Sequence, residues 1–145
     1  MKYFIDTSSL VKIYHKESGT SDLLKIYNDP ENLIQISELT CIEFLSTIHK
    51  KYREKLFTQE VLNTIINKFD EDSNLKYDIL RFSTIIFDET EILLKEIALN
   101  YSLRTLDSLQ FAFFRIYCDK ETIFVCSDVR FCNIVRKEGY KILQI

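Results

Sequence analysis

Four acidic residues lie beside apolar segments in positions from which their side chains could meet. Clustered carboxylates repel one another, and a divalent cation relieves that repulsion. Mg²⁺ or Mn²⁺ takes hard oxygen ligands, polarises a phosphodiester and lowers the pKa of its bound water. A metal-dependent hydrolytic site is therefore predicted if the fold gathers these acids. They are Asp6 after YFI, Glu43 within SELTCIEFLSTI, Asp107 within LRTLDSLQFAFF, and Asp128 after FVCS.

Each acid also has a purely structural explanation. Asp6 and Asp128 stand between an expected strand and an expected helix, where Asp is a favoured N-cap. Asp107 could complement the dipole of the helix that it begins. Glu43 could be a solvated residue, although no basic residue lies three or four positions from it to form an ion pair along a helix. The residues alone leave both interpretations open for each acid.

The elements that must position these residues alternate along the chain. Alternating strands and helices indicate an α/β fold, with a central parallel sheet of four to five strands and helices on both faces. Such sheets bind ligands beyond the carboxyl ends of their strands, so Asp6 and Asp128 are expected at one edge. Short apolar runs predict strands at 2–5, 33–36, within 79–87, 122–126 and 140–145. Helical periodicity and start signals, including a capping box of Asp88 and Glu91, predict helices at 7–16, 21–28, 38–53, from 58, from 88, 106–118 and 129–138.

Length and composition suit one domain. The chain has 145 residues, of which 46% are hydrophobic, with one Pro and two Gly, and no linker or repeat interrupts it. We therefore predict a single domain over residues 1–145. The net charge is −3, whereas proteins that grip long nucleic acid non-specifically are usually basic. Cations held by an acidic cluster reverse the local charge, so an acidic chain is compatible with a nucleic-acid substrate.

The cysteines and the N-terminal segment bear on the compartment. The four Cys residues form no CxxC pair, and no His lies near them at zinc-ligand spacing, so we expect buried, free thiols in a reducing cytoplasm. No basic segment followed by an apolar core opens the chain, and no apolar run approaches the roughly 20 residues that span a bilayer. We expect a cytoplasmic protein with no membrane partner.

Four blocks of the sequence resemble, in order, those of the PIN-domain nucleases, and among them the VapC-type toxins of type II toxin–antitoxin pairs. The blocks are FIDTSSLVKIY, SELTCIEFLSTI, LRTLDSLQFAFF and FVCSDVRFCNIVRKEGYKIL, and they cover almost the whole chain. Ser108 stands where the family usually has Ala, and Cys126-Ser127 where a Thr-Ala-like pair is common, but every acid is kept. The resemblance implies a PIN-like three-layer α/β/α nuclease domain over residues 1–145.

The resemblance further implies a metal-dependent endoribonuclease. Asp6 and Asp107 would be the principal Mg²⁺ (or Mn²⁺) ligands, and Glu43 and Asp128 would complete the catalytic, metal-binding pocket. The implied partners are an RNA substrate, a small antitoxin that inserts a side chain into the pocket, and a second copy of the chain in a homodimer.

Supporting roles fall on hydroxyl and basic residues close to the acids. The resemblance implies that hydroxyls orient the carboxylates through hydrogen bonds, and cations near the acids are candidates for contacts with RNA phosphates. The supporting hydroxyl residues are Thr7, Ser8 and Ser127; the candidate substrate-binding residues are Arg104, Lys12 and Arg130.

Other functions remain open at this point. A phosphohydrolase of the haloacid-dehalogenase type would use Asp6 as a covalent nucleophile, but it needs a second Asp two positions on, where this chain has Ser8. A catalytically weak PIN module would bind RNA or protein, yet loss of an acid would mark it, and none is lost. His15 and His49 could serve a metal-free ribonuclease as acid and base, but nothing in the sequence brings them together.

Overall fold

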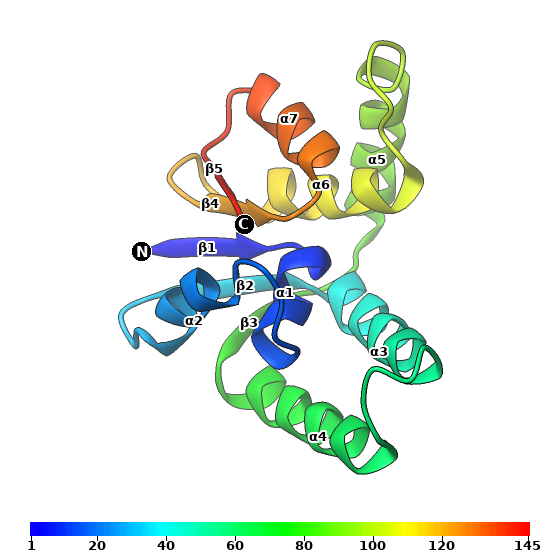
Figure 1. Cartoon of the computed structure of the whole chain (residues 1–145). Helices are drawn as coiled ribbons and strands as arrows, with labels where there is room; N and C mark the ends of the chain where they lie inside the picture. Colours follow the sequence, from blue (N-terminus) through cyan, green and yellow to red (C-terminus); the bar gives the residue numbers. More distant parts are fainter.

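A five-stranded parallel sheet runs through the centre of the molecule (Figure 1). The structure, a computed structural model, describes residues 1–145. All four pairs of neighbouring strands are parallel, and the strand order is β3-β2-β1-β4-β5. The fold class predicted from the sequence is therefore confirmed, with five strands. They are β1 (Lys2–Ile5), β2 (Leu33–Ser37), β3 (Tyr77–Leu80), β4 (Ile123–Cys126) and β5 (Ile142–Gln144).

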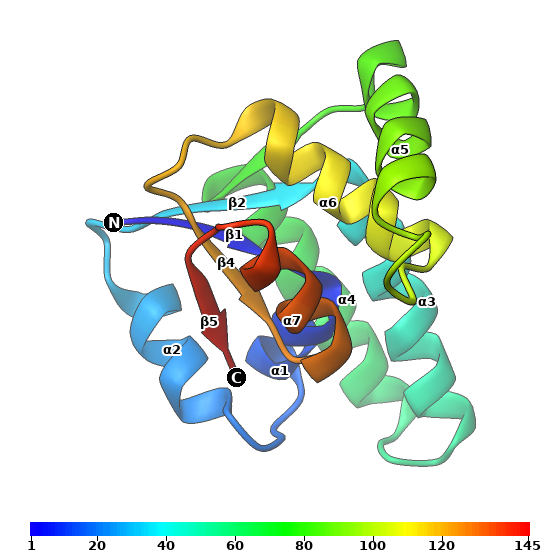
Figure 2. The same cartoon turned by 90° about the horizontal axis from the view of Figure 1, so that it is seen from above.

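Helices cover both faces of the sheet and form two separate cores. One core joins α5, α6 and α7 to Phe4 and Phe124, and these helices lie in front of the sheet in Figure 2. The other core contains residues of the four helices α1, α2, α3 and α4, packed against Ile5 and Val125. Successive strand residues thus point to opposite faces, as a pleated strand requires. The helices are α1 (Thr7–Tyr14), α2 (Thr20–Asn28), α3 (Glu38–Arg53), α4 (Gln59–Leu75), α5 (Thr84–Glu96), α6 (Thr105–Tyr117) and α7 (Val129–Lys137).

The strand predicted within 79–87 is wrong over most of its length. The strand is β3, Tyr77–Leu80, and the β-rich stretch STIIF enters α5. Ser83, with extended backbone, precedes the first turn of α5, so the predicted capping box at Asp88 lies inside the helix. Ile86, Thr90 and Leu93 are buried at helical spacing, and packing against α6 overrides the β-propensity of the individual residues.

The remaining boundaries agree with prediction to within about two residues, the usual uncertainty of helix and strand ends. The four cysteines are free, as predicted, but only Cys126 and Cys132 are buried, while Cys41 and Cys118 are partly exposed. None of the helices combines the length and the apolar character needed to cross a membrane.

A buried carboxylate fixes the helices on the α1 side of the sheet. Asp72 of α4 is 3% exposed, and its Oδ2 accepts hydrogen bonds from the hydroxyls of Tyr14 and Tyr27, each at 2.7 Å. Lys68 pairs with its other oxygen at 2.9 Å, and the Tyr14 hydroxyl also contacts that of Tyr77 at 2.6 Å. One carboxylate therefore links α4 to α1 and α2, and through Tyr14 to β3.

Candidate active site

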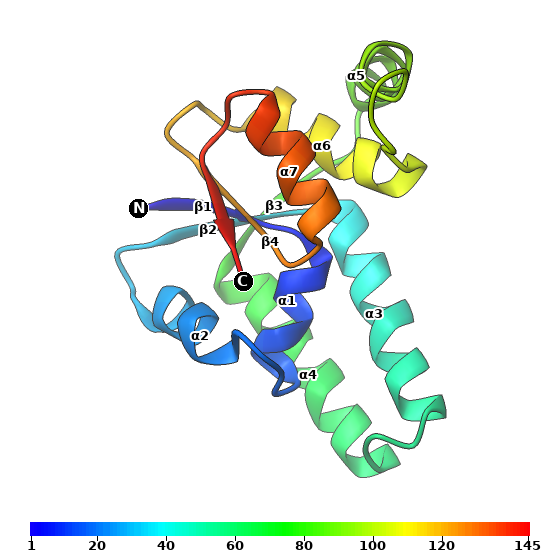
Figure 3. The same ribbon diagram turned by 45° about the horizontal axis from the view of Figure 1, so that its top comes forward.

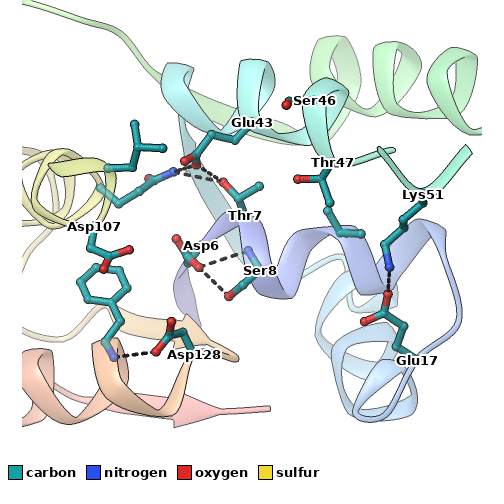
Figure 4. Close-up of a pocket in the computed structure, with 14 residues that line it drawn as sticks. Asp6, Thr7, Ser8, Glu17, Glu43, Ser46, Thr47, Lys51, Asp107 and Asp128 are labelled. Atoms are coloured by element: carbon teal, nitrogen blue, oxygen red, sulfur yellow. Dashed lines mark hydrogen bonds and ion pairs between the residues drawn. The ribbon is translucent and has the colours of Figure 1, made fainter. Parts of the chain in front are cut away.

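The four predicted acids line one open pocket at the carboxyl ends of β1 and β4 (Figure 4). The chain leaves β1 toward β2 on one side and later returns to β4 on the other, so this is the switch point of the sheet, where α/β folds bind ligands. In Figure 3, α1 lies beside α3, and α7 lies above α1 in this view. The cavity has a volume of about 450 Å³. Asp6 precedes α1, Glu43 lies on α3, Asp107 on α6, and Asp128 precedes α7.

Asp6 is both the N-cap of α1 and a wall of the pocket. Its Oδ2 accepts hydrogen bonds from the backbone N–H of Ser8 at 3.1 Å and from the Ser8 hydroxyl at 2.6 Å. The residue is only 7% exposed. Burial raises the pKa of Asp6 to about 6, the Ser8 hydrogen bonds oppose this rise, and the carboxylates of Glu43 and Asp107 add to it. The negative charge on Asp6 is therefore costly, and a cation beside it would relieve that cost.

Hydroxyls tie Asp6 to the end of β4. The backbone N–H of Ser127 donates to the Ser8 hydroxyl at 3.2 Å, and the Ser127 and Ser9 hydroxyls are 2.8 Å apart. Ser8 contacts Asp6 directly, whereas Ser127 is linked to Asp6 through Ser8. Ser9, fully buried, is a contact that the sequence did not single out.

Glu43 is held by a buried network centred on Gln110. Its Oε2 accepts hydrogen bonds from the Thr7 hydroxyl at 2.5 Å and from Nε2 of Gln110 at 2.8 Å. Gln110 is 1% exposed; its Nε2 also donates to Thr40 at 2.9 Å, and its Oε1 accepts from Ser37 at 2.7 Å. The Thr7 hydroxyl thus contacts the carboxylate of Glu43, and Gln110 is a contact that the sequence did not single out. Its isolation as an amide in the apolar stretch SLQFAFF was the available signal.

Asp107 and Asp128 are bridged by a cation from the chain itself. Nη2 of Arg130 lies 2.5 Å from Oδ2 of Asp107 and 3.3 Å from Oδ2 of Asp128. Asp128 also caps α7, since its Oδ1 accepts from the N–H of Phe131 at 2.9 Å. The pKa of Arg130 is raised, mainly by its hydrogen bond to Asp107, so this guanidinium stays charged. Arg130, predicted to bind substrate, pairs here with two of the predicted metal ligands.

The other predicted cations lie outside the pocket lining. Nζ of Lys12 donates to the carbonyl of Ile145 at 3.1 Å, and Arg104 is an exposed residue at the start of α6. The cation that does line the pocket is Lys51 of α3, which pairs with Glu17. It belongs to the basic run HKKYREK, and sequence spacing alone did not distinguish it from its neighbours.

The donor chemistry of the pocket fits a divalent cation. Four carboxylates from four separate segments supply hard oxygen ligands, and the charges of Glu43 and Asp107 add to the electrostatic cost of ionised Asp6. As the side chains stand, no three acidic, His or Cys residues are arranged to hold an ion. Two of the acids instead converge on Arg130.

The fold resembles those of solved toxin–antitoxin structures. VapBC2 from Rickettsia felis, bound to a DNA fragment from its promoter, superposes with a TM-score of 0.70 at 16% identity, covering 99% of this chain and 98% of that one. VapC20 from Mycobacterium tuberculosis, a toxin that cleaves the sarcin–ricin loop, gives 0.68 at 12% identity, covering 99% of both chains. VapBC-1 from nontypeable Haemophilus influenzae gives 0.65 at 10% identity, covering 99% and 98%. At these identities the likeness shows the fold.

The sequence itself also places the chain in a family. A search of the curated proteins found no match. The family model of the PIN domain, however, matches residues 3–137, a segment that runs from within β1 to the end of α7 and contains all four acids. The chain therefore belongs to the PIN-domain family.

Proposed function

We propose that this protein is a metal-dependent endoribonuclease that acts as the VapC-type toxin of a toxin–antitoxin pair. The observation that carries the proposal is the meeting of Asp6, Glu43, Asp107 and Asp128 in one pocket at the switch point of the sheet. Membership of the PIN-domain family supports nuclease chemistry, and the toxin–antitoxin structures of the same fold support the toxin role.

Asp6 and Asp107 would hold Mg²⁺ or Mn²⁺, with Glu43 and Asp128 completing the acidic pocket. When bound, the ion supplies charge neutralisation at the scissile phosphate and a more acidic water. Ser8 directs both of its hydrogen bonds to Oδ2 of Asp6, which fixes the carboxylate. This fixed orientation preorganises the ligand set.

Glu43 is the proposed base. Thr7 and Gln110 both bond to its Oε2, so Oε1 is the oxygen available to accept a proton from the attacking water. The water oxygen would form a bond to phosphorus as the bond from phosphorus to the leaving ribose oxygen breaks, and that ribose oxygen would gain a proton from solvent. Lys51 and Arg130 would contact flanking phosphates; Lys12 and Arg104 stay predictions as more distant contacts.

Protein partners are also part of the proposal. A small antitoxin would cover the acidic pocket, and a second copy of the chain would form a homodimer. The VapBC complexes of the same fold support the antitoxin. On α3, next to Glu43, Ile42 is 65% exposed and Leu45 37%, and exposed apolar side chains beside a site are typical of surfaces that a partner covers.

The test is cleavage of total RNA with mapped ends, using Asp6→Asn as the variant and Asp70→Asn as its control. Asp70 is exposed on α4, so its variant carries the same charge change away from the pocket. We expect wild type and Asp70→Asn to cleave in Mg²⁺ or Mn²⁺ and not in EDTA, and folded Asp6→Asn to lose more than about 100-fold in rate. Normal metal-dependent cleavage by Asp6→Asn would contradict the proposal. RNA binding without cleavage by wild type would favour a non-catalytic PIN module.

A further inference from the structure

The guanidinium of Arg130 makes three hydrogen bonds: two to carboxylates that line the acidic pocket, and one to a backbone carbonyl of a residue that lines a second cavity. Nη2 reaches Asp107 at 2.5 Å and Asp128 at 3.3 Å, and Nη1 donates to the backbone carbonyl of Ser102. Arg130 lies on the first turn of α7, while Asp107 comes from α6 and Ser102 from the loop before it. One side chain therefore joins both acids on this side of the pocket.

The contacts to the acids exclude another cation from the same oxygens. Both hydrogen bonds from Nη2 end on Oδ2 atoms, one on each carboxylate, and a divalent ion on those oxygens would lie against a positive guanidinium. Charges this close in a partly buried site repel strongly; the side chain of Arg130 is 27% exposed and that of Asp107 21%. Arg130 and a divalent ion thus compete for the same ligands.

A second cavity offers the guanidinium another position. This cavity, of about 480 Å³, is lined by Arg130 together with Tyr101, Ser102, Asn133 and Lys137. Its lining includes two cationic side chains, those of Arg130 and Lys137, and no carboxylate. An RNA phosphate would therefore be favoured there and would replace the acids as the partner of Arg130. Arg130 lines this cavity from its position on the first turn of α7, so the cavity lies within reach of the side chain.

We propose that Arg130 is an exchangeable counter-ion: it pairs with Asp107 and Asp128 in the metal-free protein, releases them when a divalent cation binds, and turns into the second cavity to meet an RNA phosphate. The inference rests on the proposed metal-dependent function. It assigns Arg130 two successive partners, and it makes the arginine an internal competitor of the metal.

The test measures Mn²⁺ affinity by calorimetry, independently of cleavage. The variant is Arg130→Gln, and the control is Arg136→Gln, which removes the same charge from an exposed position of α7 whose side chain contacts Asn133 and no carboxylate. We expect Arg130→Gln to bind Mn²⁺ at least about fivefold more tightly than Arg136→Gln. At saturating Mn²⁺, Arg130→Gln is nevertheless expected to cleave RNA more slowly, because its phosphate contact is lost.

A second variant keeps the test decisive if Arg130→Gln does not fold. Arg130→Lys retains the charge but lacks the planar fork that spans two carboxylates. Its Mn²⁺ affinity is therefore expected to be higher than that of wild type and, where Arg130→Gln folds, lower than that of Arg130→Gln. In wild type, the side-chain Nε–H resonance of Arg130, assigned from its loss in Arg130→Lys, is expected to shift on titration with Mg²⁺.

The outcomes separate the inference from the proposed function. Mn²⁺ affinity in Arg130→Gln equal to or weaker than in Arg136→Gln, with cleavage by wild type still dependent on Mn²⁺, overturns the counter-ion role and leaves the nuclease standing. Absence of Mn²⁺ binding in wild type and in every folded variant overturns both. Mn²⁺ binding by Arg130→Gln but not by wild type would show that Arg130 blocks the ligands without releasing them, and would overturn the exchange.

Discussion

Gln110 donates a hydrogen bond to Glu43 over 2.8 Å, and this contact joins the hydrogen-bonded interior to the acidic pocket. The amide is buried, and its two ends are held by Thr40 and Ser37. Because the whole side chain is fixed in this way, the direction of the Glu43 carboxylate is set by residues on α3, α6 and the end of β2. The base proposed for catalysis is therefore positioned by the core.

Gln110→Leu is expected to damage both stability and cleavage. The substitution keeps the approximate volume but leaves Ser37 and Thr40 without their amide partner, at a cost of about 1–3 kcal/mol in the free energy of unfolding. Cleavage is expected to fall about 10- to 100-fold, since Glu43 loses a fixed contact. Urea denaturation and RNA cleavage measure the two effects, with Gln59→Leu at an exposed position as control. Lost stability with unchanged cleavage would confine Gln110 to the core.

Asp6→Asn is expected to stabilise the metal-free protein at neutral pH. In the folded protein the pKa of Asp6 is about 6, above the ordinary value of 3.8. As pH rises, Asp6 therefore loses its proton in the unfolded chain before it does so in the folded protein. Stability contributed by protonated Asp6 is therefore complete below about pH 4 and lost by about pH 6. Two pKa units correspond to up to about 3 kcal/mol, and Asn remains a good N-cap. Urea denaturation in EDTA should show no advantage of Asp6→Asn at pH 4 and a clear one at pH 7.5; an equal difference at both pH values argues against a raised pKa.

Asp72→Ala is expected to loosen the α1 side of the sheet. The Tyr14 and Tyr27 hydroxyls lose their shared acceptor, and buried groups left without a partner cost about 1–3 kcal/mol each. Asp70→Ala, two positions away on the exposed side of α4, is expected to stay within about 0.5 kcal/mol of wild type. Thermal unfolding of the two variants makes the comparison, and similar midpoints would show that the Asp72 network contributes little.

Lys51→Met is expected to raise KM for RNA several-fold with a smaller change in kcat. Lys51 is the lysine that lines the acidic pocket, and its charge favours phosphate there. Lys50→Met removes the same charge from an exposed position that faces Glu54, and its KM should stay close to that of wild type. Steady-state cleavage of one defined RNA at fixed salt gives both constants. Equal effects of the two substitutions would indicate general charge attraction rather than a pocket contact.

The strongest predictions from sequence were those that depend on local pattern and topology. Asp6 and Asp128 each follow a short apolar strand, and in a parallel sheet those ends share one edge, so their meeting could be foreseen. The boundary of β3 could not, because Ile86 and its neighbours form a helix only when α6 is present to cover them.

Side-chain partners were the part that the sequence could not supply. Gln110 reaches Glu43 across a long sequence separation, and Arg130 turns back onto Asp107 rather than out to solvent. Both directions depend on how α6 packs against α3 and α7, which no short motif specifies. Spacing and topology singled out the four acids that line the pocket, but not Lys51 or Gln110, nor which side chains contact one another.

The strand order also has a consequence during protein synthesis. β4 pairs directly with β1, although it is made much later, and Asp128 follows it. The four acids can therefore meet only after almost the whole chain has been made and β4 has been added beside β1. A chain whose synthesis stops before residue 123 would contain Asp6, Glu43 and Asp107 but neither β4 nor Asp128, so it would lack one of the four acids that line the pocket.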